Sequence, residues 1–259
     1  MATPAKKTAK KKKKKKKTAK KNKLARKRGE KLSAVDLKRV QRAEEMFDDG
    51  LVLFRSRKYD QALERWHGAM EYDPYNTKVL SGLGSLLTLI NRGEDARRLF
   101  GIAAELEPEV GDHRFNLGQC WLEEGHYKNA LTCLLQARQL DPRNGMIHLT
   151  IGRTLLASGE RDEAVNCLEY TFEKHKQTPG AGLMLGDIAH DEGRPDDARS
   201  WYEQEIERFP NEPGAYKNLG IVFMEHSNTK EAIDLLEVAA KLDEGDKESR
   251  QLIERLRAL

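Results

Sequence analysis

The stretch GDHRFNLGQCWLEEGHYKNALTCLLQARQLDPRN, residues 111–144, is typical of two amphipathic helices joined by a turn at Gly125. Bulky apolar residues recur at helical spacing on both sides of this turn. They include Leu117, Trp121, Leu131 and Leu134. The stretch therefore predicts a helix–turn–helix unit whose apolar faces pack against each other.

The unit is repeated along the chain at a step of 34 residues. Glycine recurs at Gly50, Gly84, Gly118, Gly152, Gly186 and Gly220, and alanine recurs at Ala62, Ala96, Ala130, Ala164, Ala198 and Ala232. Because glycine makes up about 7% of an average protein, five further glycines in one fixed register arise by chance roughly twice in a million. The chain is therefore a repeat array.

The repeated positions have a physical explanation. The glycine lies midway along the first helix of each unit and the alanine lies in the second, so both are small where two helices must approach closely. At the turn between the helices we expect a left-handed residue, which commonly ends a helix. This position holds Arg57, Asn91, Gly125, Gly159, Gly193 and Ser227. Proline cannot continue a helix, and it closes most units, at Pro74, Pro108, Pro142 and Pro210.

These residues closely resemble the tetratricopeptide repeat family over residues 43–244. In the unit quoted above, the family's pattern is matched by Leu117, Gly118, Trp121, Tyr127, Ala130, Ala137 and Pro142. Other units depart from it at Asp49, Thr171, Glu205, Lys176 and Glu244. The resemblance implies an all-α fold, a right-handed solenoid of six helix–turn–helix repeats, in which each repeat contacts only its neighbours.

We expect three segments in the chain. Residues 1–32 form a lysine-rich tail, residues 33–244 form six repeats, and residues 245–259 form a capping helix. The repeats are placed at 43–76, 77–110, 111–144, 145–178, 179–212 and 213–244. Ser33 followed by Asp36 resembles a capping box, so the first helix should run from about residue 34 to about 56. Asp246 should begin the last helix, whose apolar stripe is Leu252, Ile253, Leu256 and Leu259.

The tail differs sharply in charge from the repeats. Residues 1–32 contain 17 Lys or Arg residues against Glu30 alone, a net charge of +16, so residues 33–259 carry −12 of the total of +4. With eight consecutive lysines, Lys10–Lys17, and no aromatic residue, the tail is expected to be disordered. These lysines are Lys10, Lys11, Lys12, Lys13, Lys14, Lys15, Lys16 and Lys17.

The lysine run is a candidate polyanion-binding segment. Its composition resembles the lysine-rich tail of linker histones, and such runs neutralise phosphates without reading bases. The alternatives are a tether to an anionic surface, a nuclear-entry signal if the organism has a nucleus, and self-association with the acidic repeats. The sequence does not choose between them.

Motifs for catalysis, metal binding and membrane insertion are missing from the sequence. Cys120, Cys133 and Cys167 include no CxxC pair, and we expect them to be small buried residues in a reducing compartment. The histidines include no HExxH and no pair at helical spacing. No apolar stretch follows the basic tail as a signal peptide requires, and no run approaches 18 apolar residues. We therefore expect neither an enzyme nor a cofactor or metal site, and a cytoplasmic location, or a nuclear one in a eukaryote.

The resemblance implies a binding groove lined by the first helices of successive repeats. It points to Phe115, Gln119, Leu122, Leu149, Arg153, Leu156, Leu183, Asp187 and His190. Related proteins use an asparagine amide, which can both donate and accept, to hold the backbone of an extended peptide, and Asn116 and Asn218 occupy that place. The alternative is that these residues are simply polar residues on a solvated face.

One subtype of the family grips the C-terminal carboxylate of large chaperones with lysine, asparagine and arginine side chains. The corresponding residues here are Phe47, Leu51, Gly82, Asp112 and Asn116, and no later set of repeats completes the pattern. We therefore do not expect binding to chaperone tails. The sequence favours a non-enzymatic scaffold that binds a peptide or protein segment. The alternative is a nucleic-acid-associated adaptor in which the tail binds nucleic acid and the repeats recruit partners.

Overall fold

The computed structural model describes residues 33–258, and every regular element in this range is an α-helix. The chain divides into two compact units after Leu140, which we call unit 1 (residues 33–140) and unit 2 (residues 141–258). The sequence predicts one continuous array and gives no sign of this division. The predicted disorder of residues 1–32 lies outside the described residues.

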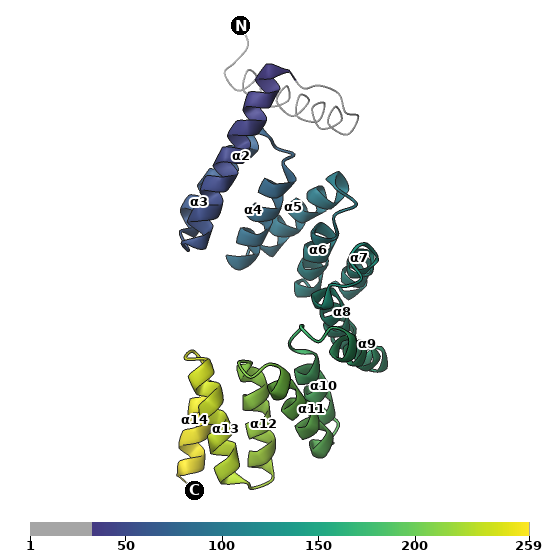
Figure 1. Ribbon diagram of the computed structural model, residues 1–259, viewed down its shortest axis with the longest axis vertical. Helices are drawn as coiled ribbons and strands as arrows, with labels where there is room; N and C mark the ends of the chain where they lie inside the picture. Colours follow the sequence, from purple (N-terminus) through teal and green to yellow (C-terminus); the bar gives the residue numbers. More distant parts are fainter. Residues whose placement is uncertain (1–32, 259) are drawn as a thin grey trace. The chain divides into compact units, whose positions relative to one another are not determined.

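Each unit contains three helix pairs (Figure 1). Unit 1 consists of α2 (Ala34–Arg55), α3 (Tyr59–Tyr72), α4 (Thr77–Leu89), α5 (Gly93–Leu106), α6 (Gly111–Glu123) and α7 (Tyr127–Leu140). Unit 2 consists of α8 (Gly145–Ser158), α9 (Arg161–Lys174), α10 (Ala181–Asp191), α11 (Pro195–Arg208), α12 (Pro213–Glu225), α13 (Thr229–Leu242) and a single last helix, α14 (Lys247–Arg257). Within each unit a helix packs against its partner and against the next pair along the chain. The predicted all-α fold of helix–turn–helix repeats is confirmed.

The first and last helices begin at side-chain caps. The Ser33 side chain accepts a hydrogen bond from the Asp36 backbone N–H, and Asp246 accepts from the backbone N–H groups of Glu248 and Ser249. These bonds satisfy amide groups that have no partner inside the helix. On the inward side of α14, Ile253 and Leu256 are buried against α13.

The turn between the two helices of every pair adopts the predicted left-handed conformation. Its φ angle is positive at Arg57, Asn91, Gly125, Gly159, Gly193 and Ser227, from 58° to 88°. In the quoted unit this conformation lets the His126 N–H donate to the Trp121 carbonyl oxygen at 2.8 Å. The bond satisfies a carbonyl group that the ending helix leaves free.

Every glycine of the 34-residue ladder makes room for a large side chain of the partner helix. A Cβ atom on Gly50 would lie 2.3 Å from Trp66 Nε1, and one on Gly186 would lie 2.3 Å from Tyr202 Cε1. The equivalent side chains, each 16 residues after its glycine, are Trp66, Phe100, Leu134, Leu168, Tyr202 and Leu236, and all are buried. Burying such a side chain stabilises the fold by about 1.5–3 kcal/mol. The glycines therefore admit a bulky residue, and a Cβ atom on Gly118 or Gly220 would also lie 3.3 Å from a backbone oxygen of the partner helix.

The alanine ladder is buried as predicted. Ala130 is 0% exposed in α7, and the space that a larger residue would need is occupied by α6. We therefore expect Ala130→Leu to lower the free energy of unfolding by about 1–3 kcal/mol through overpacking. Thermal and urea unfolding followed by circular dichroism measures this loss. Asn129→Leu, at an exposed neighbour, should change stability by no more than about 0.5 kcal/mol, and equal effects of the two substitutions would refute the packing.

Candidate functional site

Four of the predicted groove residues lie on α6 in unit 1. Phe115, Asn116, Gln119 and Leu122 are all half-buried. Within the described part of the chain, no hydrogen bond joins the Asn116 side chain to another residue. Its amide can therefore donate and accept in a contact with an external chain.

The other predicted groove residues lie in unit 2. Leu149, Arg153 and Leu156 are on α8, Leu183, Asp187 and His190 are on α10, and Asn218 is on α12. The three leucines are half-buried and pack against the core of the unit, so they contribute to folding as well as to the surface. Arg153 is exposed, and no ion pair to it is found among the described residues.

Asp187 and Asn218 are brought together by hydrogen bonds. Asp187 Oδ1 accepts from Asn218 Nδ2 at 2.6 Å and from Tyr202 Oη at 2.8 Å. Tyr202 extends from α11 past Gly186 to reach this carboxylate, and its side chain is buried. Burial, and then the negative charge of Asp187, raise the pKa of Tyr202 far above its ordinary value, so the phenol stays protonated and donates. The three residues form a fixed polar network.

A hydrogen bond and an ion pair flank this network. His190 Nε2 lies 2.8 Å from Glu225 Oε2, which links α10 to α12, and Lys217 Nζ lies 3.1 Å from Glu248 Oε2, which links α12 to α14. Both pairs are partly exposed, so each contributes at most about 1 kcal/mol to stability.

Three residues on α12 occupy the same repeat positions as predicted groove residues but were not themselves predicted. Lys217, Ile221 and Met224 lie on α12 one repeat step after Leu183, Asp187 and His190, so the 34-residue period could have identified them. Tyr202 could not be identified in this way, because the period places it with buried core residues. We call the repeated set on the first helices of unit 2 the first-helix face. It comprises Leu149, Arg153, Leu156, Leu183, Asp187, His190, Lys217, Ile221 and Met224.

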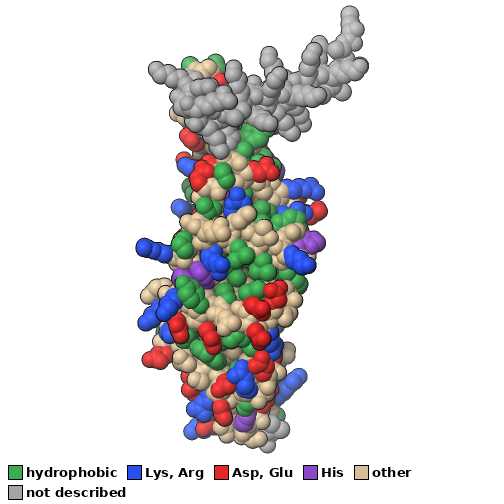
Figure 2. Space-filling view, turned by 90° about the vertical axis from the view of Figure 1, so that its right-hand side faces the viewer, with side chains coloured by type: hydrophobic (Ala, Val, Ile, Leu, Met, Phe, Trp, Pro, Cys, Tyr) green, Lys and Arg blue, Asp and Glu red, His purple; other side chains and the backbone are tan. Residues whose placement is uncertain are grey.

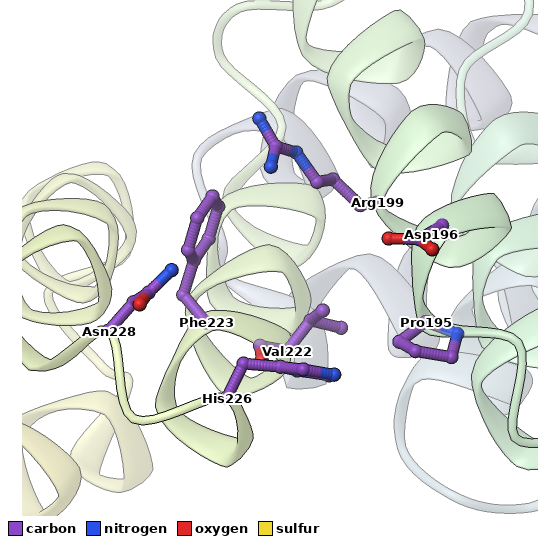
Figure 3. Close-up of a pocket in the computed structure, with 7 residues that line it drawn as sticks. All are labelled: Pro195, Asp196, Arg199, Val222, Phe223, His226 and Asn228. Atoms are coloured by element: carbon purple, nitrogen blue, oxygen red, sulfur yellow. The ribbon is translucent and has the colours of Figure 1, made fainter.

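A separate pocket of about 220 Å³ lies in unit 2 (Figure 3). It is lined by Pro195, Asp196, Arg199, Val222, Phe223, His226 and Asn228, none of which belongs to the predicted groove. The Arg199 guanidinium lies 5.0 Å from the centre of the Phe223 ring and its Nε donates to Glu203 at 2.7 Å. Ligand sites are usually larger, about 300–1,000 Å³, so this pocket is a weaker candidate than the first-helix face.

The cysteines and other metal-binding side chains are scattered. Cys120 is buried, but Cys133 and Cys167 are half-buried, so the predicted burial holds fully for one of the three. Burial raises the pKa of both Cys120 and Cys133, which keeps these thiols protonated. Across residues 33–258 no three His, Cys, Asp or Glu side chains are grouped as a metal site would need, and no helix there could cross a membrane. The polyanion-binding candidates Lys10–Lys17 lie outside the described residues.

Two models of one family match this chain, and both describe the tetratricopeptide repeat. One matches residues 114–144, and the other matches residues 149–213 and again 183–247, so together they cover half of the sequence. The chain belongs to the tetratricopeptide repeat family. Its fold is therefore that of a scaffold typical of protein–protein interaction, in a family that is generally non-enzymatic.

Solved structures of other tetratricopeptide repeat proteins share this fold. A protein from Parabacteroides merdae superposes with a TM-score of 0.71 at 15% identity, over 83% of this chain and 84% of that one. PilF of Pseudomonas aeruginosa gives a TM-score of 0.66 at 17% identity, over 85% and 98%. The complex of Cut9 and Hcn1 from APC/C also gives 0.66, at 15% identity, over 83% and 42%. At these identities the likeness shows the fold alone.

A more local match is the peroxisomal targeting signal receptor of Candida glabrata. It is 28% identical over 88 residues, which is 34% of this chain and 15% of the receptor. This chain thus spans a small part of the length of that receptor. It also spans less than half of the matched chain of the Cut9 complex.

Proposed function

We propose that this tetratricopeptide repeat protein is a non-enzymatic scaffold whose first helices hold an extended segment of a partner protein. The observation that carries the proposal is the exposed Arg153 on α8, which has no ion-pair partner among the described residues, together with the hydrogen-bonding groups on other first helices of unit 2. Arginine is enriched among residues that dominate binding energy. In unit 1, Asn116 on α6 separately presents a half-buried amide with no hydrogen-bond partner among the described residues.

The relative from Candida glabrata supports a partner of this kind. Its name describes a receptor for a targeting signal. The match is consistent with a protein segment, rather than a small molecule, as the class of ligand.

The double substitution Asn116→Ala with Arg153→Ala tests this function. Because neither side chain is buried in the core, the melting temperature should stay nearly unchanged, while affinity for the partner recovered from native cells should fall by about 5-fold or more. Calorimetric titration measures the affinity. A matched control is Ser200→Ala with Glu203→Ala on the exposed part of α11. Wild-type affinity in the first variant would leave both residues as ordinary solvated polar groups.

A second candidate function is a nucleic-acid-associated adaptor, and the charge of residues 1–32 favours it. These residues carry 17 basic side chains against one acidic one, whereas residues 33–140 carry 14 against 17 and residues 141–259 carry 15 against 24. On the face of the repeats in Figure 2, Lys and Arg side chains are interspersed with Asp and Glu. The basic tail is thus the part of the chain suited to phosphate. Purification of the full-length protein beside a chain beginning at Ser33 separates the two functions, because only nucleic acid should be lost with the tail.

A further inference from the structure

We propose that the first-helix face of unit 2 selects a partner segment that carries a basic side chain opposite Asp187 and an acidic side chain opposite Arg153. This inference rests on the proposed scaffold function and specifies the chemistry of its ligand. It follows from the state of these two side chains in the structure.

Asp187 is oriented with one oxygen engaged and the other available. Tyr202 and Asn218 both donate to Oδ1, and no donor to Oδ2 is present among the described residues. A carboxylate oxygen accepts strong hydrogen bonds from ammonium and guanidinium groups. Because two donors already fix the carboxylate, a basic group that binds Oδ2 does not have to order the side chain first.

The network is not required for packing. The positions equivalent to Tyr202 in the other pairs are Trp66, Phe100, Leu134, Leu168 and Leu236, which fill the same space without a hydroxyl group. The positions equivalent to Asp187 are Leu51, Ser85, Gln119, Arg153 and Ile221, and none is acidic. The phenol and the carboxylate therefore occur together in one repeat only, where one orients the other.

Arg153 on α8 occupies the repeat position equivalent to Asp187 on α10, and its charge is opposite to that of Asp187. It is exposed, and no carboxylate lies within ion-pair distance of it in the described part of the chain, Asp187 included. One repeat after Asp187 the same position holds Ile221. The face thus presents a basic, an acidic and an apolar side chain in chain order. A complementary segment presents acidic, basic and apolar side chains.

This pattern distinguishes an external segment from the lysine run of the same chain. Lys10–Lys17 could supply a basic group to Asp187, but the run contains no acidic residue to place against Arg153. Neighbouring lysines would instead be repelled by that arginine. The charge pattern therefore favours a partner with both charges over the run Lys10–Lys17.

The probe is a displayed library of random 12-residue peptides, selected on the full-length protein. We expect enriched peptides to contain an acidic and a basic residue in fixed order. Affinities of the best peptide follow from fluorescence anisotropy. Asp187→Lys and Arg153→Glu should each weaken binding by about 10- to 100-fold, the range for loss of a charge-assisted hydrogen bond. A peptide with the facing charge reversed should regain most of the loss.

Further variants separate orientation from folding. Tyr202→Phe keeps the buried ring but removes the hydroxyl, so it should lower the affinity for the peptide that carries the basic residue. The affinity for a peptide whose basic residue is replaced by norleucine should not change. Glu169→Lys, an exposed substitution on α9, is the matched control and should have no effect. Changing Lys10–Lys17 to glutamine in the full-length protein should leave the affinity unchanged.

Three results would overturn the inference. Peptides that bind equally well to both charge-reversed variants would refute the charge pattern while leaving the scaffold function intact. Markedly tighter binding after the lysine substitutions would show that the tail occupies the face. Absence of any enriched peptide would overturn the inference together with the scaffold function on which it rests.

Discussion

Replacing Glu205 with alanine should lower the free energy of unfolding of unit 2 by about 2–6 kcal/mol. The Glu205 side chain is fully buried, and its carboxylate accepts the backbone N–H groups of Gly180 at 2.5 Å and Gly182 at 3.0 Å. Alanine leaves both amides at the start of α10 without a partner, at about 1–3 kcal/mol each. Thermal and denaturant unfolding of the full-length protein measures the loss.

The repeat pattern alone predicts the opposite effect of Glu205→Ala, so the measured stability distinguishes the two expectations. The equivalent position holds Ala69, Ala103, Ala137 and Ala239 in four other pairs, so the pattern alone would expect Glu205→Ala to be neutral or stabilising. The structure differs because Gly182 has no side chain, and a Cβ atom there would lie 2.6 Å from Glu205 Oε2. Glu207→Ala, at an exposed site on α11, is the control and should change stability by no more than about 0.5 kcal/mol. An unchanged melting temperature in Glu205→Ala would show that the carboxylate does not hold α10.

The same carboxylate should make stability depend on pH. Burial raises the pKa of Glu205 above its ordinary value, although the bonds from Gly180 and Gly182 lower it in part. Between the unfolded and the folded pKa the folded state binds more protons, so stability falls as pH rises through this interval. The advantage of the wild type over Glu205→Gln should therefore shrink as the pH rises from about 4.3 toward the folded pKa.

Duplex DNA binding by the full-length protein should weaken by roughly 10³ to 10⁵ when salt rises from about 50 to about 200 mM. This range holds if six to ten lysines of Lys10–Lys17 and its neighbours engage phosphates, because each contact releases counterions. Sequence preference should be small, since residues 1–32 contain no aromatic residue to stack on bases. Fluorescence anisotropy over a salt series measures both effects.

The matched protein for this experiment begins at Ser33. Residues 33–259 carry a net charge of −12, which repels phosphate, so this shorter chain should not bind duplex DNA. Binding that persists in it, or that hardly responds to salt, would assign the contact to the repeats instead of the tail. Weak binding at both salt concentrations by the full-length protein would remove the adaptor as a candidate function.

The sequence was sufficient for the parts of the fold that repeat. The glycine and alanine ladders identified the helix pairs, and the position of Gly125 located all six left-handed turns, including those at Arg57, Asn91 and Ser227. The repeated pattern predicts the structure here because every helix pair packs in the same way, with small and large residues at a fixed separation. The division after Leu140 was not predicted, because the period continues through it without interruption.

The sequence was insufficient where a residue departs from the repeat. Glu205 departs from the pattern, and its role depends on Gly180 and Gly182, more than 20 residues earlier. Asn218 was predicted to contact a peptide, yet its amide donates to Asp187. It therefore has fewer hydrogen-bonding groups left for a peptide than the sequence indicated. Such pairings depend on which helices are neighbours in space, which neither periodicity nor composition specifies.

The central claim is that a partner segment lies along the first helices, and site-specific photo-crosslinking tests it most directly. Benzoylphenylalanine would replace Ala157 on α8, one turn after Arg153, in one protein and Glu169 on α9 in another, both at exposed positions. The partner recovered from native cells would be added to each protein, and the mixtures would be irradiated. We predict crosslinked partner from position 157 and none from position 169. Crosslinking from position 169 alone, or equally from both positions, would contradict the account.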